Sequence, residues 1–163
     1  MDKIKVGAVS YLNSKPLLYG IKNTSIINEI ELIEDYPSRI AEKLLNNEID
    51  VGLVPVAIIP SMKEYHIITN YGIACDGEVA SVCLFSEVPI NNIKKILLDY
   101  QSCTSVALVQ ILVKEYWKIN VVFEQATEYF RDQIKDTTAA VVIGDRAFEQ
   151  KHISPYYYDL GLA

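Results

Sequence analysis

The stretch VGAVSYLNSKPLL, residues 6–18, decides the fold. Its apolar run stops at Ser10, and a helix is predicted to begin near Ser14 with Pro16 in its first turn. Open α/β folds bind ligands at such strand ends, and a helix N-terminus offers backbone N–H groups to an anion. The stretch therefore predicts a two-lobed α/β protein that holds a small carboxylate in the cleft between its lobes.

Strand-like and helix-like segments alternate through the first half of the chain. Strands are predicted at 4–9, 30–33, 51–55 and within 66–73, and helices at 14–19, 37–45 and 58–62. The order β-α-β-α-β-α-β is typical of a mostly parallel sheet with right-handed crossovers.

The second half predicts its own α/β unit. Residues 75–78, CDGE, interrupt two apolar runs, so we expect lobes at 1–76 and 77–163 with a hinge near 74–80. Further strands are predicted at 79–85, 96–98, 121–123, 139–143 and 155–160, and helices at 102–117, at 127–133 and after Gly144.

Composition excludes several classes of function. The formal net charge is −6 and no Lys/Arg run occurs, which argues against nucleic acid as a partner. The start, MDKIKVGAV, does not resemble a signal peptide, and no apolar run approaches the roughly 20 residues of a membrane span. We therefore expect a cytoplasmic protein without a membrane partner.

Cysteine and histidine usage gives no sign of a metal site. Cys75, Cys83 and Cys103 have no metal-ligand spacing and are expected to be reduced thiols. His66 and His152 stand outside any motif, so neither a zinc site nor a His-based triad is expected. We predict no cofactor.

Polar clusters follow four predicted strand ends, at 10–14, 77–81, 102–105 and 144–146. Each has a local alternative, because Ser14, Ser102, Thr104 and Asp145 also suit helix N-caps, each worth about 1 kcal/mol. Arg146 also suits an ion-paired or solvated surface position. The coincidence of several polar strand ends nevertheless favours a ligand site.

Five motifs together resemble one family. They are SYLNSKPL (10–17), DVGLVPV (50–56), GEVASVCLFSEVPI (77–90), LLDYQSCTSVALVQILV (97–113) and VVIGDRA (141–147). In this order they resemble the chorismate dehydratases of the futalosine route to menaquinone. The resemblance implies the type-2 periplasmic-binding-protein fold, with two α/β lobes and mixed, mostly parallel sheets. SYLNSKPL stands where the related dihydroxynaphthoate synthase carries a Pro-rich segment, which favours the dehydratase.

The resemblance implies the loss of water from chorismate to give 3-[(1-carboxyvinyl)oxy]benzoate, without a redox cofactor or a metal. Asn13 is then a candidate catalytic residue for the departing hydroxyl, and Asp145 a candidate acid, base or orienting group. Proton removal by a carboxylate of the substrate itself is an open alternative, with positioning supplying much of the acceleration. Substrate contacts are expected at Ser10, Ser14, Ser81, Ser102, Thr104 and Ser105, of which the last three receive one carboxylate.

Other readings differ in function rather than in fold. A solute-binding protein, a ligand-sensing domain of a transcription regulator, or an enzyme like dihydroxynaphthoate synthase share the expected architecture. Chorismate dehydratases continue past 163 residues and cross back to complete the first lobe. We therefore expect this fold to be truncated at its C-terminus, with residues 1–76 lacking their return segment. The oligomeric state is left open.

Overall fold

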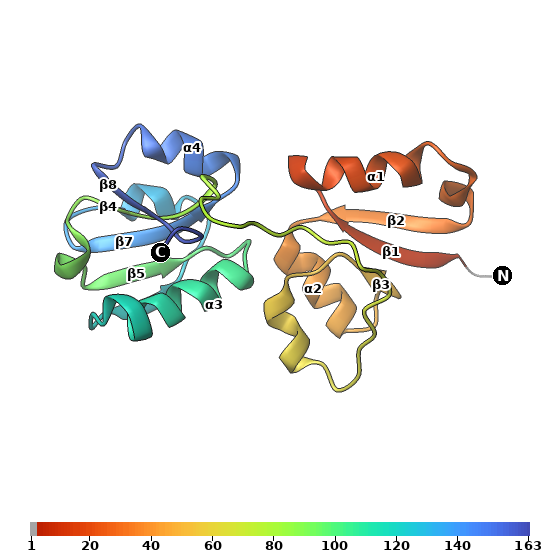
Figure 1. The fold of residues 1–163 in the computed structure, drawn as a ribbon, viewed down its shortest axis with the longest axis horizontal. Helices are drawn as coiled ribbons and strands as arrows, with labels where there is room; N and C mark the ends of the chain where they lie inside the picture. Colours follow the sequence, from red (N-terminus) through yellow and green to blue (C-terminus); the bar gives the residue numbers. More distant parts are fainter. Residues whose placement is uncertain (1–2) are drawn as a thin grey trace. The chain divides into compact units, whose positions relative to one another are not determined.

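The computed structural model describes residues 3–163, which divide into two units, residues 3–73 and 74–163 (Figure 1). Both units combine strands with helices, as the sequence predicts. No helix within the described residues is long and apolar enough to cross a membrane. Each unit is considered separately below.

The sheet of unit 1 has three parallel strands in the order β2-β1-β3. Its strands are β1 (Ile4–Val9), β2 (Ile30–Asp35) and β3 (Val51–Gly52). The central strand, β1, pairs with β2 along its whole length, from Ile4 opposite Ile30 to Val9 opposite Asp35. Because all three strands run the same way, the residues that follow them lie at one edge of this sheet.

Two helices flank this sheet, on opposite faces in Figure 1. They are α1 (Lys15–Lys22) and α2 (Pro37–Leu45), and 3-10 turns occur at η1 (Leu12–Ser14), η2 (Ser25–Asn28) and η3 (Val56–Ser61). The helix α2 lies close to β1, since a Cβ added at Gly7 would be 2.9 Å from Ile40 Cγ2 and 2.5 Å from Ile49 Cδ1. Only glycine fits at position 7 without displacing this packing.

The strand predicted within residues 66–73 is wrong. The structure has no strand or helix in this segment, and Ile68 and Tyr71 are 70% and 82% exposed. The segment is apolar enough to suggest a strand, but it pairs with no strand among the described residues. Apolar composition without a partner for the backbone N–H and C=O groups does not make a strand.

The sheet of unit 2 has five strands in the order β6-β5-β7-β4-β8. They are β4 (Val82–Ser86), β5 (Lys95–Leu98), β6 (Val122–Gln125), β7 (Thr138–Ile143) and β8 (Tyr156–Asp159). Strands β6 and β7 pair parallel to β5, whereas β4 is antiparallel to both β7 and β8. The carboxyl ends of β5, β6 and β7 therefore share an edge with the start of β4.

Helices α3 (Thr104–Ile111) and α4 (Asp145–Lys151) lie on opposite sides of this sheet in Figure 1. The predicted helix 102–117 is present over most of its length, although a π-helical turn, η5 (Leu112–Trp117), forms its second half. The helix predicted at 127–133 is wrong in extent, because only the 3-10 turn η6 (Phe130–Gln133) forms there. A further 3-10 turn, η4 (Ile90–Asn92), precedes β5.

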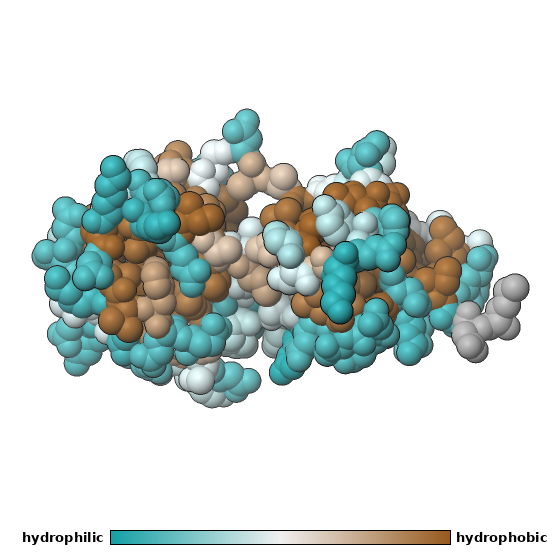
Figure 2. All heavy atoms as spheres, turned by 90° about the horizontal axis from the view of Figure 1, so that it is seen from below, coloured by the Kyte–Doolittle hydropathy of each residue, from teal (hydrophilic) through white to brown (hydrophobic). Residues whose placement is uncertain are grey.

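The core of unit 2 lies between the sheet and these turns. Phe85 and Phe130 are its largest side chains and are each at most 1% exposed, packed with Leu97 and Val142. Figure 2 shows hydrophilic residues around apolar ones on the visible face of each unit. Burial of apolar side chains in such a core is the main contribution to the stability of the folded unit, at about 25 cal/mol per Å² of apolar surface removed from water.

Candidate functional site

In unit 1 the predicted site residues follow the carboxyl end of β1. The Ser10 N–H donates to the carbonyl of Asp35, the last residue of β2, at 3.1 Å, so the two strand ends stay joined beyond the sheet. The side chains of Ser10 and Asn13 are exposed, whereas Ser14 is fully buried. Two of the three predicted residues here are thus accessible to a ligand.

Ser14 occupies the N-cap position of α1, but its hydroxyl makes no capping bond. The hydroxyl Oγ instead lies 3.5 Å from Asn13 Oδ1, at the limit of hydrogen-bond distance. The interpretation of Ser14 as a capping side chain is therefore wrong. Its contact leaves the Nδ2 group of Asn13 as the donor that can turn to a ligand.

In unit 2 the start of β4 meets the end of β7. The Gly144 N–H donates to the Ser81 carbonyl at 2.8 Å, which places Ser81 beside the segment that leads to Asp145. Gly144 has φ +68°, a conformation that L side chains rarely adopt, and it turns the chain directly into α4. Asp145 is the first residue of that helix and is exposed.

The segment after β5 forms the N-terminus of α3. The N-cap residue of α3 is Cys103, so Ser102 does not hold the predicted N-cap position, but its Oγ accepts the N–H of Ser105 at 3.1 Å and so satisfies one N–H of the first turn. Its hydroxyl proton can still be donated to a ligand. Ser102 and Ser105 are each 9% exposed, and Thr104, the first residue of the eight-residue α3, is half-buried.

A buried ion pair lies at the same edge. Asp99 follows β5 directly, and its carboxylate is fully buried. Its Oδ2 accepts Arg146 Nη2 at 2.7 Å and the N–H of Ile143 at 3.2 Å, and its Oδ1 accepts the N–H of Gln101 at 3.0 Å. Asp99 was not among the predicted site residues. The ion-paired alternative for Arg146 is confirmed, but its side chain is only 23% exposed and does not extend into solvent.

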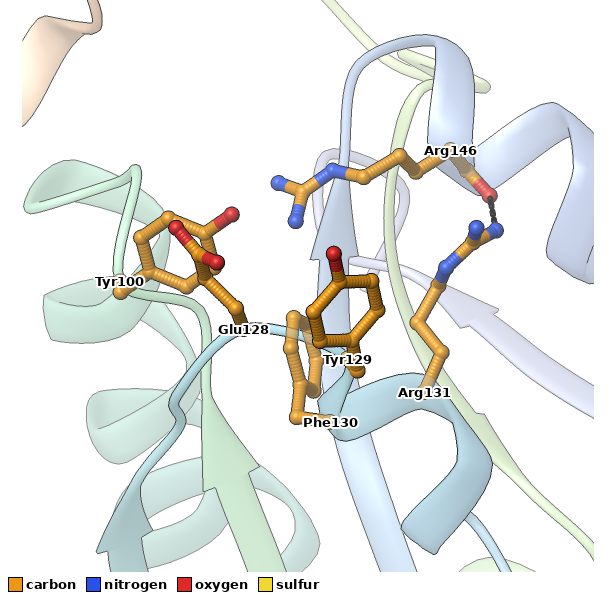
Figure 3. A pocket seen from close by; sticks show the side chains of 6 residues that line it. All are labelled: Tyr100, Glu128, Tyr129, Phe130, Arg131 and Arg146. Atoms are coloured by element: carbon orange, nitrogen blue, oxygen red, sulfur yellow. Dashed lines mark hydrogen bonds between the residues drawn. The ribbon is translucent and has the colours of Figure 1, made fainter.

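Aromatic rings flank the same guanidinium. The Arg146 Cζ lies 5.5 Å from the centre of the Tyr100 ring and 5.8 Å from that of Phe130. These residues line a cavity of about 230 Å³, drawn in Figure 3. Its lining residues are Tyr100, Glu128, Tyr129, Phe130, Arg131 and Arg146. The sequence signal that could indicate this cavity is the polar and aromatic run after β6, for which the sequence predicts a helix at 127–133.

Arg131 closes the far side of the cavity. Its Nη1 donates to Glu149 Oε2 at 2.8 Å. The same Nη1 donates to the Arg146 carbonyl at 3.4 Å, the bond drawn in Figure 3. Both bonds reach α4, so this arginine joins η6 to that helix. The guanidinium of Arg131 is therefore occupied by its own unit, whereas that of Arg146 extends toward Tyr100 in Figure 3.

The loop before β4 is held by Asp159. The carboxylate accepts the N–H groups of Val79 (3.2 Å), Ala80 (2.6 Å) and Gly161 (2.9 Å). Burial acts to raise the pKa of Asp159, but these backbone donors outweigh burial and hold that pKa below its ordinary value. The carboxylate thus fixes the loop that ends at Ser81.

The cysteines offer no activated nucleophile in this arrangement. All three are free, with Cys75 exposed and Cys83 buried. Burial, assisted by the Asp159 charge, raises the pKa of Cys83 to about 11, and burial also raises that of Cys103. Among residues 3–163 no group of three His, Cys, Asp or Glu side chains is placed to hold a metal ion.

Comparisons with known proteins identify the relatives of this chain. A sequence family described as "Menaquinone biosynthesis" matches residues 4–163. A chorismate dehydratase from Thermus thermophilus is 25% identical over 111 residues, which cover 68% of this chain and 40% of that protein. The resemblance stated from the motifs is thereby confirmed at the level of the family.

Solved structures confirm the fold class. A crystal structure of a protein from Archaeoglobus fulgidus matches with a TM-score of 0.70 at 15% identity, over 97% of this chain and 60% of that one. A Candida albicans protein described as having the generic periplasmic binding protein fold matches with a TM-score of 0.56 at 14% identity, over 82% of this chain and 49% of that one. The chain thus spans 40% of the curated relative and 60% of the Archaeoglobus structure.

Proposed function

The chain belongs to the menaquinone biosynthesis family, and on that premise we propose that it is part of a chorismate dehydratase. The reaction is the elimination of water from chorismate to give 3-[(1-carboxyvinyl)oxy]benzoate, which makes the protein a hydro-lyase. The observation that carries the proposal is the likeness to the Thermus thermophilus chorismate dehydratase. The SYLNSKPL and SCTSVAL motifs at strand ends of the two units support it further.

The chemistry requires little beyond placement. The ring hydroxyl departs with the C–O electron pair, and a proton leaves the neighbouring ring carbon that bears the ether. Together they form water, and the electrons of the broken C–H bond complete the aromatic ring. Aromatisation supplies the driving force, so the protein has to fix the geometry and remove one proton.

One carboxylate of the substrate is assigned to the start of α3. The backbone N–H of Thr104, at the first position of α3, is available to an anion, whereas that of Ser105 is donated to Ser102 Oγ, and the helix dipole also favours an anion there. The hydroxyls of Ser102 and Thr104 are the side-chain donors beside it. This assignment uses hydrogen-bond donors and needs no lysine or arginine at that point.

Asn13 is the proposed catalytic residue of unit 1. Its exposed carboxamide can donate from Nδ2 to the departing hydroxyl and stabilise the charge that develops there. Ser10, also exposed, supplies a further polar contact, while Ser14 acts through Asn13 because its buried hydroxyl faces Oδ1. Asp145 and Ser81 are proposed to contact the substrate from unit 2.

The base is proposed to be a carboxylate of the substrate, with Asp145 as the alternative. Asp145 is exposed at the first position of α4. A carboxylate fixed beside the C–H bond gains rate from proximity alone. The lobes 1–76 and 77–163, with a hinge near 74–80, are proposed each to contribute substrate contacts.

The proposal is tested with Asn13 variants and chorismate. Asn13→Ala and Asn13→Asp should lower kcat by about 100-fold, the scale of losing one donor to developing charge, with unfolding unchanged. Asn28→Ala, at an exposed asparagine of η2, is the matched control and should keep full turnover. Near-normal turnover in both Asn13 variants would remove this residue from the mechanism. Binding of chorismate without product by the unmodified protein would favour a solute-binding or ligand-sensing role.

A further inference from the structure

The guanidinium of Arg146 lines the cavity, and the protein itself uses only some of its N–H groups. We propose that this cavity is a second carboxylate subsite, which binds one carboxylate of a ring-bearing dicarboxylate through Arg146. The inference rests on the proposed function and extends it, because the other carboxylate is the one assigned to the start of α3. Arg146 then becomes a residue that determines specificity for a dicarboxylate.

The hydrogen bonds of Arg146 leave one side of its guanidinium for a ligand. Nη2 donates to Asp99 Oδ2 at 2.7 Å and to Gln101 Oε1 at 2.9 Å. A guanidinium carries five N–H groups in a planar fork. The two bonds use those of Nη2, so the three on Nη1 and Nε can serve a carboxylate in the bidentate geometry that arginine favours.

The guanidinium is also held in place before any ligand arrives. Asp99 is fully buried and anchored by the backbone N–H groups of Ile143 and Gln101. The rings of Tyr100 and Phe130 lie 5.5 and 5.8 Å from the Arg146 Cζ. These partners of Arg146 come from segments that follow β5 and β6 and precede α4. Folding therefore already fixes the guanidinium, so ligand binding does not carry the entropy cost of ordering it.

The walls of the cavity suit an aromatic ring. Tyr100, Tyr129 and Phe130 provide three rings that line the cavity (Figure 3). A planar ring can pack against such walls while its carboxylate meets the guanidinium. Gln101, which accepts a hydrogen bond from Arg146 Nη2, directly precedes Ser102 of the other proposed subsite.

The negative charge of Glu128 at the cavity allows a second test of anion binding. Glu128 is exposed and lines the cavity, where its carboxylate opposes an incoming anion. Arg131 is occupied by Glu149. Removing the Glu128 charge should therefore favour the dicarboxylate, whereas removing the Arg146 charge should oppose it. Opposite effects of the two substitutions on the preference for the dicarboxylate are what an anion bound here predicts.

The test compares two ligands by isothermal titration calorimetry. The first is the dicarboxylate product, 3-[(1-carboxyvinyl)oxy]benzoate, and the second is 2-phenoxyprop-2-enoate, which keeps the ring and the side-chain carboxylate but lacks the ring carboxylate that the cavity would bind. The unmodified chain should prefer the dicarboxylate by about tenfold or more, the scale of one hydrogen-bonded charge pair. Arg146→Gln should abolish most of this preference, Arg146→Lys should retain part of it, and Glu128→Gln should increase it.

Three results overturn the inference and are distinguishable. If Arg146→Gln keeps the preference, or weakens both ligands equally, the cavity is not a second carboxylate subsite although the proposed function stands. If the unmodified chain binds neither ligand, the proposed function fails with it. Should Arg146→Gln not fold, Glu128→Gln and Arg146→Lys decide the question, and an unchanged preference in both would overturn the inference.

Discussion

Arg146 Nη2 lies 2.7 Å from Asp99 Oδ2, although 47 positions separate the two residues. The pair joins the end of β5 to the start of α4, which are the two segments of unit 2 that carry most of the proposed site residues. The carboxylate is fully buried and the arginine side chain is 23% exposed, so solvent screens the pair weakly.

Removing the charge of Asp99 should destabilise the protein strongly. Asp99→Asn leaves Arg146 without its carboxylate and turns an amide N–H₂ toward donors, so we expect a loss of about 3 kcal/mol in the free energy of unfolding. Urea denaturation followed by circular dichroism measures this loss. The control is Lys95→Gln, which breaks the more exposed Lys95–Glu124 pair and should cost less than about 1 kcal/mol. Equal losses in both variants would contradict the account.

Asp159 should make the protein sensitive to acid. Because its folded pKa lies below the ordinary value of 3.8, its contribution to stability is fully present above that value and is lost as pH falls through the folded pKa. Asp159→Asn should therefore lose stability at pH 7 and show a shallower decline below pH 4 than the unmodified protein. Thermal unfolding from pH 7 to pH 2 measures it. Asp132→Asn, at an exposed aspartate of η6, should leave the acid decline unchanged.

Two substitutions of Ser102 distinguish its contribution to helix stability from its proposed role in substrate binding. Ser102→Ala removes the oxygen that accepts the Ser105 N–H and should cost about 1 kcal/mol of stability. Ser102→Asp keeps a capping oxygen but adds a negative charge where we propose a carboxylate. It should therefore retain stability while weakening chorismate binding by at least about tenfold. Unchanged binding by Ser102→Asp would show that the anion does not lie at the start of α3.

Two glycines of unit 1 should respond in opposite ways to alanine. Gly7→Ala places a Cβ 2.5 Å from Ile49 Cδ1, and such overpacking should cost about 1–3 kcal/mol. Gly20 lies within α1 with no atom within 4 Å of an added Cβ, so Gly20→Ala should stabilise by about 0.5–1 kcal/mol. Denaturation midpoints of the two variants on either side of the unmodified protein would confirm the packing of α2 on β1.

The parts that the sequence predicts correctly depend on local patterns. The apolar run 4–9 becomes β1, and the helix predicted from residue 102 begins as α3 at Thr104. Residues 66–73 show where such patterns fail. Their composition suits a strand, but whether a strand forms depends on a partner elsewhere in the chain, which composition does not contain.

The Asp99–Arg146 pair illustrates the same limit for the site. Each residue stands inside a motif of the family, yet nothing in the sequence says that two positions 47 apart share a hydrogen bond. The aromatic cavity is likewise assembled from the ends of β5, β6 and β7, and Tyr129 enters it with φ +63°, a backbone conformation that its residue type does not suggest. The candidate serines can be predicted because each lies in a short polar segment at a predicted strand end. Asp99 and Arg146, whose hydrogen bond joins two of these segments, cannot be predicted in this way.

The most direct measurement of the central claim is the conversion of chorismate, followed by liquid chromatography with mass spectrometry. The account predicts one aromatic product, 3-[(1-carboxyvinyl)oxy]benzoate, formed with loss of one water. With chorismate carrying deuterium on the ether-bearing ring carbon, the label should appear in solvent and be absent from the product. Chorismate that is bound and recovered unchanged, or a product that still carries the label, would contradict the account.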